Sequence, residues 1–406
     1  MGIVVQKFGG SSVADIDKIR HVATRVTQEV DAGNKVVVVV SAMGDTTDEL
    51  LELAAQTGAS TRASREMDML LATGEQQTAA LLALVLDQMG YPAISLTGWQ
   101  AGILTDQKYS KARINDVNSE RLDHELDNGK IVVVAGFQGL TEDGDVTTLG
   151  RGGSDTTAVA LAAAIKADVC DIYTDVEGVF TADPRLVPNA RKMKTISYEE
   201  MLELASLGAV VMQPRAVEYG MLYGVPIQVR STFKETAGSI IMGVKEMENR
   251  RPVTGVAHDF NVGKLALFDV PDVPGVASRI FNALADESID VDMIIQSAMQ
   301  NDHNDIAFTV SAVDLPRAHE VINRVAEDLG GVHTYAAQNV AKVSIVGAGM
   351  QSNPGVAAAM FAALSAEGIN IQMISTSEIK VSCIIDSIDC QRAVKALHQR
   401  FELDKE

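Results

Sequence analysis

Two glycine-rich turns combine the residue types that a phosphate site needs. The turn Lys7–Ser12 (KFGGSS) follows a short apolar run, and the turn Gly150–Asp155 (GRGGSD) opens an alanine-rich stretch. Glycines let backbone N–H groups come close to phosphate oxygens, and the start of a helix favours an anion. Lys7 and Arg151 add positive charge. Each turn alone could also be an ordinary connection between a strand and a helix, so both interpretations stay open at this point.

Three further motifs place polar residues beside apolar or helical patterns. Ser41–Asp48 (SAMGDTTD) directly follows the run Val36–Val40, and Thr174–Arg185 (TDVEGVFTADPR) follows another such run. In open parallel sheets, ligands bind beyond the carboxyl ends of the strands, where these residues would lie. Gly74 precedes Glu75 inside a long helical pattern, at a cost of about 1 kcal/mol relative to alanine, which indicates a bend or a close backbone contact. A plain helix cap in the first motif and a solvated glutamate at position 75 are the alternatives.

The elements that must position these motifs alternate along the first part of the chain. Short β-branched runs, some of them continuously apolar, alternate with helical patterns, which is typical of a mostly parallel sheet buried between helices. The predicted strands are Ile3–Phe8, Lys35–Val40, Pro92–Leu96, Ile131–Ala135, Asp168–Tyr173 and Pro226–Val229, and the predicted helices are Ile16–Val30, Asp48–Ala55, Arg65–Met89, Thr156–Ile165 and Tyr198–Leu207.

The rest of the chain contains an internal repeat. Pro274–Ala277 (PGVA) matches Pro354–Ala357 (PGVA), eighty positions later, and the register holds without a gap as far as Ile294 and Ile374. Each copy reads as a strand, a Pro-Gly turn, an amphipathic helix and a second strand, which is half of a βαββαβ ferredoxin-like unit. A polar and charged stretch at 244–252 predicts the boundary between the two parts of the chain.

The composition excludes several function classes. A formal net charge of −20 repels nucleic acid and anionic membranes, so we expect neither as a partner. Cys170, Cys383 and Cys390 have no CxxC spacing and predict buried thiols in a reducing cytosol. No signal sequence begins the chain and no apolar run approaches about 18 residues, so we expect a cytoplasmic protein without a membrane span.

In their order and separations, the motifs resemble the aspartokinase family over nearly the whole chain. The resemblance implies an amino-acid-kinase fold followed by two ferredoxin-like ACT domains, and the reaction L-aspartate + ATP → 4-phospho-L-aspartate + ADP. It implies Mg²⁺ bound with ATP and assigns no metal ligand to the protein. The matching segments are Lys7–Val13, Ser41–Gly44, Met69–Glu75, Gly150–Asp155, Thr174–Arg185 and Gln213–Tyr219. The implied domain limits are 1–243 for the catalytic domain, 244–252 for a linker, 264–338 for the first ACT domain, and 253–262 plus 339–406 for the second.

The resemblance also implies roles for single residues. Lys7, Arg151 and Asp155 are the implied catalytic residues, and Glu75 would take the ammonium group of aspartate. A carboxylate substrate is already a nucleophile at neutral pH, so no general base is needed and the protein must mainly neutralise charge. The implied ATP contacts are Lys7, Phe8, Gly9, Gly10, Thr174, Asp175, Phe180 and Arg185, and the implied aspartate contacts are Ser41, Thr47, Glu75, Arg151, Gly152, Gly153 and Ser154.

One position departs from the family pattern. Many relatives have a lysine where this chain has Val210, so a second cation near the nucleotide is missing. Either Arg185 or Arg215 compensates, or ATP binds more weakly.

The ACT domains imply an amino-acid sensor. We expect feedback inhibition by lysine, threonine or both, in an enzyme that begins lysine, threonine and methionine biosynthesis, and a homo-oligomer joined through the ACT domains. An internal start at Met242 or Met247 would give an ACT-only small subunit. A purely dimerising module, a non-catalytic sensor, and an acetylglutamate or UMP kinase on the same fold are the alternatives. The candidate effector contacts are Asp272, Gln296, Ser352, Ser377 and Glu378.

Overall fold

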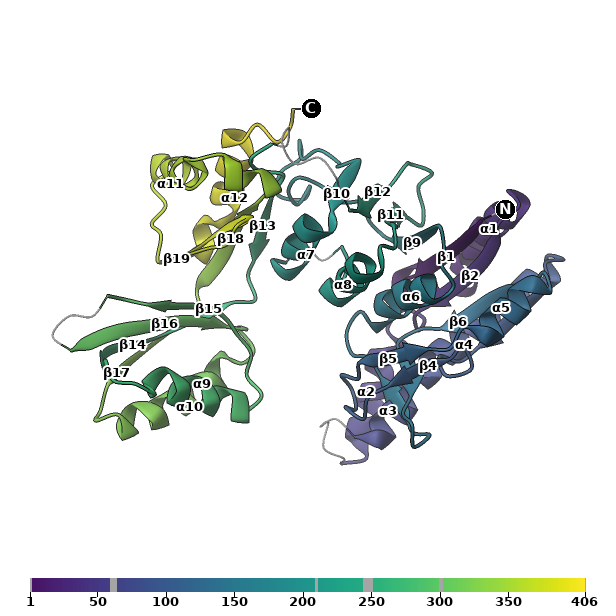
Figure 1. Cartoon of the computed structure of the whole chain (residues 1–406), viewed down its shortest axis with the longest axis horizontal. Helices are drawn as coiled ribbons and strands as arrows, with labels where there is room; N and C mark the ends of the chain where they lie inside the picture. The colour runs from purple at the N-terminus through teal and green to yellow at the C-terminus, as the bar shows by residue number, and fades with distance from the viewer. Residues whose placement is uncertain (1, 59–63, 209–210, 244–250, 299–301, 406) are drawn as a thin grey trace. The chain divides into compact units, whose positions relative to one another are not determined.

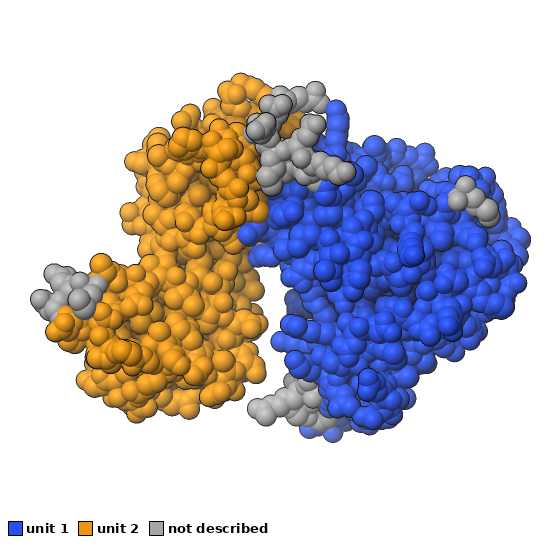
Figure 2. Space-filling model, viewed as in Figure 1, with its two compact units in different colours: residues 1–179, 192–206, 210–245 blue, residues 180–191, 207–209, 246–406 orange. Residues whose placement is uncertain are grey.

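The computed structural model describes residues 2–58, 64–208, 211–243, 251–298 and 302–405. The chain divides into two compact units (Figure 2). The first unit comprises Met1–Val179, Lys192–Ser206 and Val210–Lys245, and the second comprises Phe180–Arg191, Leu207–Ala209 and Glu246–Glu406.

An eight-stranded sheet forms the centre of the first unit. Its strand order is β10-β12-β11-β9-β1-β2-β6-β3, and all neighbours are parallel except β11 and β12. All six predicted strands are present within two residues of their predicted ends, and the short strands β10 and β12 add to them. The bounds are β1 (Ile3–Phe8), β2 (Lys35–Val40), β3 (Ala93–Leu96), β6 (Ile131–Ala135), β9 (Val169–Thr174), β10 (Thr195–Ser197), β11 (Ile227–Ser231) and β12 (Ser239–Met242).

Helices cover both faces of this sheet (Figure 1). Val36, Val38 and Val40 of β2 bury against α1 and α4, because side chains alternate along a strand. Helix α6 packs on the opposite face, and α8 packs against α6. The bounds are α1 (Ile16–Asp31), α2 (Thr46–Gln56), α3 (Arg65–Leu71), α4 (Thr73–Gln88), α5 (Glu120–Asp127), α6 (Gly153–Ala164), α7 (Tyr198–Ser206) and α8 (Pro214–Tyr223). A small sheet of β5 (Ile114–Val117), β4 (Ile103–Thr105), β7 (Gln138–Leu140) and β8 (Val146–Thr148) completes the unit.

The predicted helix Arg65–Met89 consists of two helices, α3 and α4, which meet at Ala72. By length and composition alone, the stretch Arg65–Gln88 could cross a membrane. However, Leu82 and Leu86 are fully buried in the core beside the central sheet. The stretch is therefore a core helix pair of this unit.

Two antiparallel four-stranded sheets form the second unit. The first has the order β15-β16-β14-β17, and α9 and α10 lie on one of its faces (Figure 1). The second has the order β13-β18-β20-β19 and packs against α11 and α12. Strand β13 precedes the first repeat in the sequence and pairs with β18 of the second. The bounds are β13 (Gly255–Asp259), β14 (Gly263–Pro271), α9 (Val276–Asp286), β15 (Val291–Gln296), β16 (His303–Val310), α10 (Leu315–Asp328), β17 (His333–Ala337), β18 (Val340–Val346), α11 (Val356–Ala366), β19 (Met373–Thr376), β20 (Lys380–Asp386) and α12 (Cys390–Arg400).

The segment Phe180–Arg191 belongs to a different unit from the one that the predicted domain limits gave it. It lies within the range 1–243 but belongs to the second compact unit. Ala182 and Val187 join the apolar core of the second ACT sheet, and the Thr181 hydroxyl is 3.0 Å from Nε2 of the buried His398. Apolar contacts therefore fix this segment to the second unit.

Candidate active site

The turn after β1 and the loop after β2 lie against each other, because the two strands are parallel neighbours. The Ser41 N–H donates to the Phe8 carbonyl (3.1 Å), and the Gly44 N–H donates to the Gly10 carbonyl (3.2 Å). A Cβ added to Gly10 would lie 3.0 Å from the Ala42 carbonyl oxygen. A glycine at position 10 thus allows the two backbones to approach.

Lys7 and Asp155 join the two glycine-rich turns. The Lys7 ammonium lies 2.6 Å from Asp155 Oδ1, and both side chains are about nine-tenths buried. A Cβ added to Gly9 would lie 3.4 Å from Lys7 Nζ, so the ammonium group sits directly beside the first turn. A carboxylate from the first turn of α6 therefore orients the cation at the end of β1.

The second turn is equally constrained. Gly152 caps α6 in the left-handed region (φ 66°), and a Cβ added there would lie 1.6 Å from Cγ of Gln213. Ser154 is buried beside Gly136, where an added Cβ would approach its hydroxyl to 2.8 Å. The Arg151 guanidinium is exposed and has no hydrogen-bond or ion-pair partner within the described residues. Arg151 is thus available to an anion, while the backbone on both sides of it is fixed.

Glu75 is a buried carboxylate at the start of α4. The Ala42 N–H donates to its Oε1 (3.2 Å), and its Oε2 has no partner in the described part of the chain. Burial raises the pKa of Glu75 to about 7. A Cβ added to Gly74 would lie 2.9 Å from the Ala42 side chain, which explains the predicted close contact. The free oxygen can accept a hydrogen bond from a cationic ligand.

A cavity of about 190 Å³ lies between the end of β1, the end of β9 and the start of α6. It brings together Lys7, Gly9, Asp155 and Thr174 from the predicted set. Sequence reasoning did not assign Ser11 and Gln213, although both lie in motifs that carry the family resemblance. The lining residues are Lys7, Gly9, Ser11, Asp155, Ile172, Tyr173, Thr174, Val211, Met212 and Gln213.

Other predicted residues lie apart from this cavity or have different surroundings. The Phe8 ring is fully buried and stacks on Tyr173 (4.5 Å between ring centroids), so only its backbone can meet a phosphate. Thr47 lies in the first turn of α2, and the exposed Asp175 accepts a hydrogen bond from the Thr174 hydroxyl (3.0 Å). Phe180 and Arg185 belong to the second compact unit.

Neither arginine proposed to compensate for Val210 has an unengaged guanidinium. Val210 itself lies outside the described residues. Arg215 donates to the carbonyls of Leu149 (2.7 Å) and Ala112 (2.9 Å). Arg185 donates from two nitrogens to Asp183. Arg215 therefore supports the backbone before the second turn.

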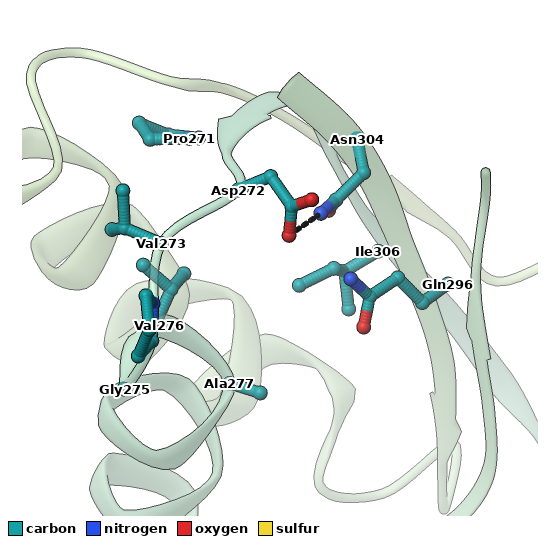
Figure 3. A pocket seen from close by; sticks show the side chains of 10 residues that line it. Pro271, Asp272, Val273, Gly275, Val276, Ala277, Gln296, Asn304 and Ile306 are labelled. Atoms are coloured by element: carbon teal, nitrogen blue, oxygen red, sulfur yellow. Dashed lines mark hydrogen bonds between the residues drawn. The ribbon is translucent and has the colours of Figure 1, made fainter. Parts of the chain in front are cut away.

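A second cavity, of about 400 Å³, lies in the first ACT repeat, between the start of α9, the ends of β14 and β15, and the start of β16 (Figure 3). Asp272 and Gln296, two of the predicted effector contacts, both line it. The Asn304 amide donates to Asp272 (3.1 Å), and the buried Oδ1 of Asn304 has no partner within the described residues. Sequence reasoning missed Asn304. The available signal was a polar residue in the buried phase of a strand, together with Ile306 and Phe308.

The other three predicted effector contacts lie in the second ACT copy. Ser352, Ser377 and Glu378 are all exposed. Gln351 donates to Glu378 (2.8 Å), and Ser352 donates to the Gly349 carbonyl (3.3 Å). The Ser352 hydroxyl thus bonds within its own turn, whereas the bond between Gln351 and Glu378 links two turns of this copy.

Comparison with known proteins decides the family. A model of the amino acid kinase family matches residues 2–231, and an ACT domain model matches residues 269–325 and 343–401. An aspartokinase of Geobacillus stearothermophilus is 52% identical over 406 residues, which covers 100% of this chain and 98% of the relative. Aspartokinase 2 of Bacillus subtilis is 51% identical over 405 residues, covering 100% and 99%. The chain belongs to the aspartokinase family.

Solved aspartokinases have the same architecture. Aspartokinase III of E. coli in complex with aspartate and ADP superposes with a TM-score of 0.81 at 26% identity, covering 98% of this chain and 99% of that one. The same E. coli enzyme in complex with lysine and aspartate gives a TM-score of 0.79 at 25% identity, with the same coverage. The predicted family, fold class and enzyme class, an ATP-dependent aspartate kinase, are thereby confirmed.

Proposed function

We propose that this aspartokinase transfers the γ-phosphoryl group of ATP to the β-carboxylate of L-aspartate, giving 4-phospho-L-aspartate and ADP. The observation that carries the proposal is the 2.6 Å contact between Lys7 and Asp155, which links the two glycine-rich turns at one cavity. A related enzyme, E. coli aspartokinase III, has been solved with aspartate and ADP.

Charge neutralisation is the main task in this reaction, because a carboxylate and a phosphate must approach each other. Lys7 and the N–H groups of Gly9 and Gly10 would hold the terminal phosphate, and Arg151 with Ser154 would hold the reacting carboxylate. Fixed cations and N–H groups aimed at the developing charge lower the barrier without reorganisation. Before a phosphate binds, Asp155 would hold the Lys7 ammonium group in position.

Mg²⁺ would enter with the nucleotide. In the described residues, no group of three His, Cys, Asp or Glu side chains could hold an ion. Mg²⁺ commonly keeps several waters and binds through substrate phosphates with one or two carboxylates, so this chain fits a metal bound mainly by ATP. Bound Mg²⁺ would supply further positive charge at the phosphates.

Aspartate would be recognised by its two charged ends. The buried Glu75 has one oxygen without a partner in the described part of the chain, and this oxygen suits an ammonium group. Ser41 and Thr47 come from the adjacent loop and the first turn of α2. Thr174 and Asp175, at the end of β9, are the proposed nucleotide contacts in the first unit, and Phe180 and Arg185 stay proposals in the second.

Measurement of ADP release with aspartate, glutamate and acetylglutamate tests the function. We expect turnover with aspartate alone, since the site must match both the length of the side chain and the free ammonium group. Equal or greater turnover with acetylglutamate, which has no free ammonium group, would overturn the proposal.

We also propose that lysine, threonine or both inhibit the enzyme through the first ACT cavity. Helix α9 begins beside this cavity with Gly275 as a cap that has no side-chain bond, so its N–H groups can receive a carboxylate. Asp272 and the Asn304 oxygen, which has no partner among the described residues, suit an ammonium group. E. coli aspartokinase III has been solved with lysine. Activity measured against each amino acid, alone and together, tests this, and a flat response throughout would remove it.

We further propose that the protein is cytoplasmic and catalyses the first step of lysine, threonine and methionine biosynthesis. We also propose that it forms a homo-oligomer joined through the ACT domains, with the domain limits 1–243, 264–338 and 253–262 plus 339–406. Size-exclusion chromatography with light scattering would measure the oligomeric state, and a strictly monomeric chain would contradict it.

A further inference from the structure

Asp68 of α3 is a fully buried carboxylate with an unusual set of donors. It accepts the Ser110 N–H (3.0 and 2.9 Å to its two oxygens) and the Ser110 hydroxyl (3.1 Å). It also accepts the Thr148 N–H (2.7 Å) and the Thr148 hydroxyl (3.0 Å). Within the described residues, no lysine, arginine or histidine forms an ion pair with it. Hydrogen bonds from two chain segments therefore compensate the buried charge.

Both segments border the turn that carries Arg151. Thr148 ends β8, two residues before Gly150. The Ser110 carbonyl lies under Gly150, where an added Cβ would come within 2.9 Å of it. Ser110 has a φ of 64°, a region that costs a residue with a side chain about 1 kcal/mol or more. The bond from its N–H to Asp68 favours this conformation.

Arg215, which lies on α8, binds the same two segments. Arg215 donates to the carbonyls of Leu149 and Ala112. The Ala112 N–H also donates to the Thr148 carbonyl (3.0 Å). A carboxylate and a guanidinium thus bind neighbouring backbone groups of the same two segments, directly before the second turn. Among the residues that the structure describes, the exposed Arg151 side chain has no partner to fix it.

We propose that Asp68 is a positioning residue for phosphoryl transfer, which acts through the backbone at 148–150 to hold Arg151 and the glycines that follow it. The inference rests on the proposed function, because Arg151 is there assigned to the reacting carboxylate. A purely structural carboxylate would instead stabilise the fold without a specific effect on aspartate.

Asp68→Asn tests the proposal with little change in shape. An amide can keep the two backbone N–H bonds, but its NH₂ group forces both hydroxyls to accept, and the negative charge is lost. We expect kcat/KM for aspartate to fall about tenfold or more, with the KM for ATP unchanged. Glu200→Gln is the matched control. Glu200 is also buried and accepts from the Ser197 N–H and hydroxyl, but it lies on α7 and caps that helix locally.

Two further measurements separate positioning from general stability. In a double-mutant cycle with Arg151→Ala, the effect of Asp68→Asn on kcat/KM should shrink to about twofold or less, because the residue that it positions is gone. Hydrogen exchange should become faster at 149–153 in Asp68→Asn and stay unchanged there in Glu200→Gln.

Each failure has a separate meaning. Additive effects of the two substitutions, an equal rise of both KM values, or unchanged exchange at 149–153 would overturn the positioning role. Wild-type enzyme without turnover of aspartate would overturn the proposed function, and the exchange measurement would still decide whether Asp68 fixes the turn.

Discussion

The cavity beside Lys7 and the cavity beside Asp272 use charge differently. In the first, opposite charges from two turns already contact each other at 2.6 Å. In the second, a carboxylate contacts a neutral amide, Asn304, whose buried oxygen lacks a partner in the described residues. A site for phosphoryl transfer benefits from charges that are fixed before the ligand arrives. A sensor cavity with an unsatisfied polar group gains the most when a ligand completes it.

Removal of the fixed charge should have the largest effect. We expect Lys7→Ala to lower turnover by about 10²- to 10³-fold, because the site loses its preorganised cation. Inhibitor binding, measured by calorimetry, should be unchanged, since Asp272 and Asn304 remain. Lys35→Ala is the control: Lys35 pairs with Asp127 at 2.6 Å on the surface of β2, away from the cavity. Turnover near that of the wild type in Lys7→Ala would place the phosphate site elsewhere.

Distortion of the second turn comes next. Gly152→Ala must displace Gln213, because the new methyl group would overlap its side chain. We expect turnover about 100-fold lower by steady-state kinetics. The additional substitution Gln213→Ala should restore part of it. Gly144→Ala is the control, because Gly144 also has a positive φ (85°) but has open space around its Cβ position. An equal loss in this control would show that backbone strain alone is responsible.

The protonation of Glu75 should make aspartate binding, but not ATP binding, depend on pH. Its pKa of about 7 means that the carboxylate, which an ammonium group needs, is lost as the pH falls below 7. The KM for aspartate should therefore rise at lower pH while the KM for ATP stays level, and Glu75→Gln should raise the KM for aspartate about tenfold or more and remove this pH dependence. An unchanged pH profile in that variant would contradict the role.

The burial of Glu75 also affects the stability of the fold. Aspartate binding needs the ionised carboxylate, whereas folding favours the protonated form. The folded state holds a proton on Glu75 up to a higher pH than the unfolded chain does, so this residue costs stability as the pH rises from about 4.5 to 7. Thermal unfolding of Glu75→Gln above pH 7 should give a melting temperature at or above that of the wild type. A clear decrease would mean that the carboxylate is stabilised by groups other than Ala42.

The sensor cavity should show the smallest effect on catalysis. Asp272→Ala should raise the concentration of lysine or threonine that half-inhibits the enzyme by about tenfold, with basal turnover unchanged. Ser352→Ala is the matched control, since Ser352 occupies the equivalent position eighty residues later and donates to a carbonyl of its own turn. A larger loss of inhibition in Ser352→Ala would move the effector site to the second ACT copy.

Much of the fold could be predicted because the sequence pattern directly reflects burial. The continuous valines of β2 and the repeat at Pro274 and Pro354 identified the buried sheet and the duplicated units. The family resemblance implied catalytic roles for Lys7 and Asp155, and the structure adds the 2.6 Å contact between them. The short strands β10 and β12 were missed, because three or four residues give no clear periodicity.

The remaining features depend on contacts between distant segments. The attachment of Phe180–Arg191 to the second unit follows from the burial of Ala182 and Val187 among residues far along the chain. Arg215 was one of two candidates for a compensating cation near the nucleotide, yet it binds two carbonyls that lie 66 and 103 residues away. Neither motif spacing nor local propensity contains such information.

The packing of Phe180–Arg191 in the second unit affects how the chain can be cut into a kinase fragment and an ACT fragment. A product that starts at Met242 would include β13 and both ACT repeats but lack Ala182 and Val187, and so would present an uncovered apolar surface beside α12. A kinase fragment cut at 243 would carry the same two side chains without their core. Gene fission at this boundary therefore yields two fragments that each expose apolar surface. Each fragment needs a partner that covers this surface.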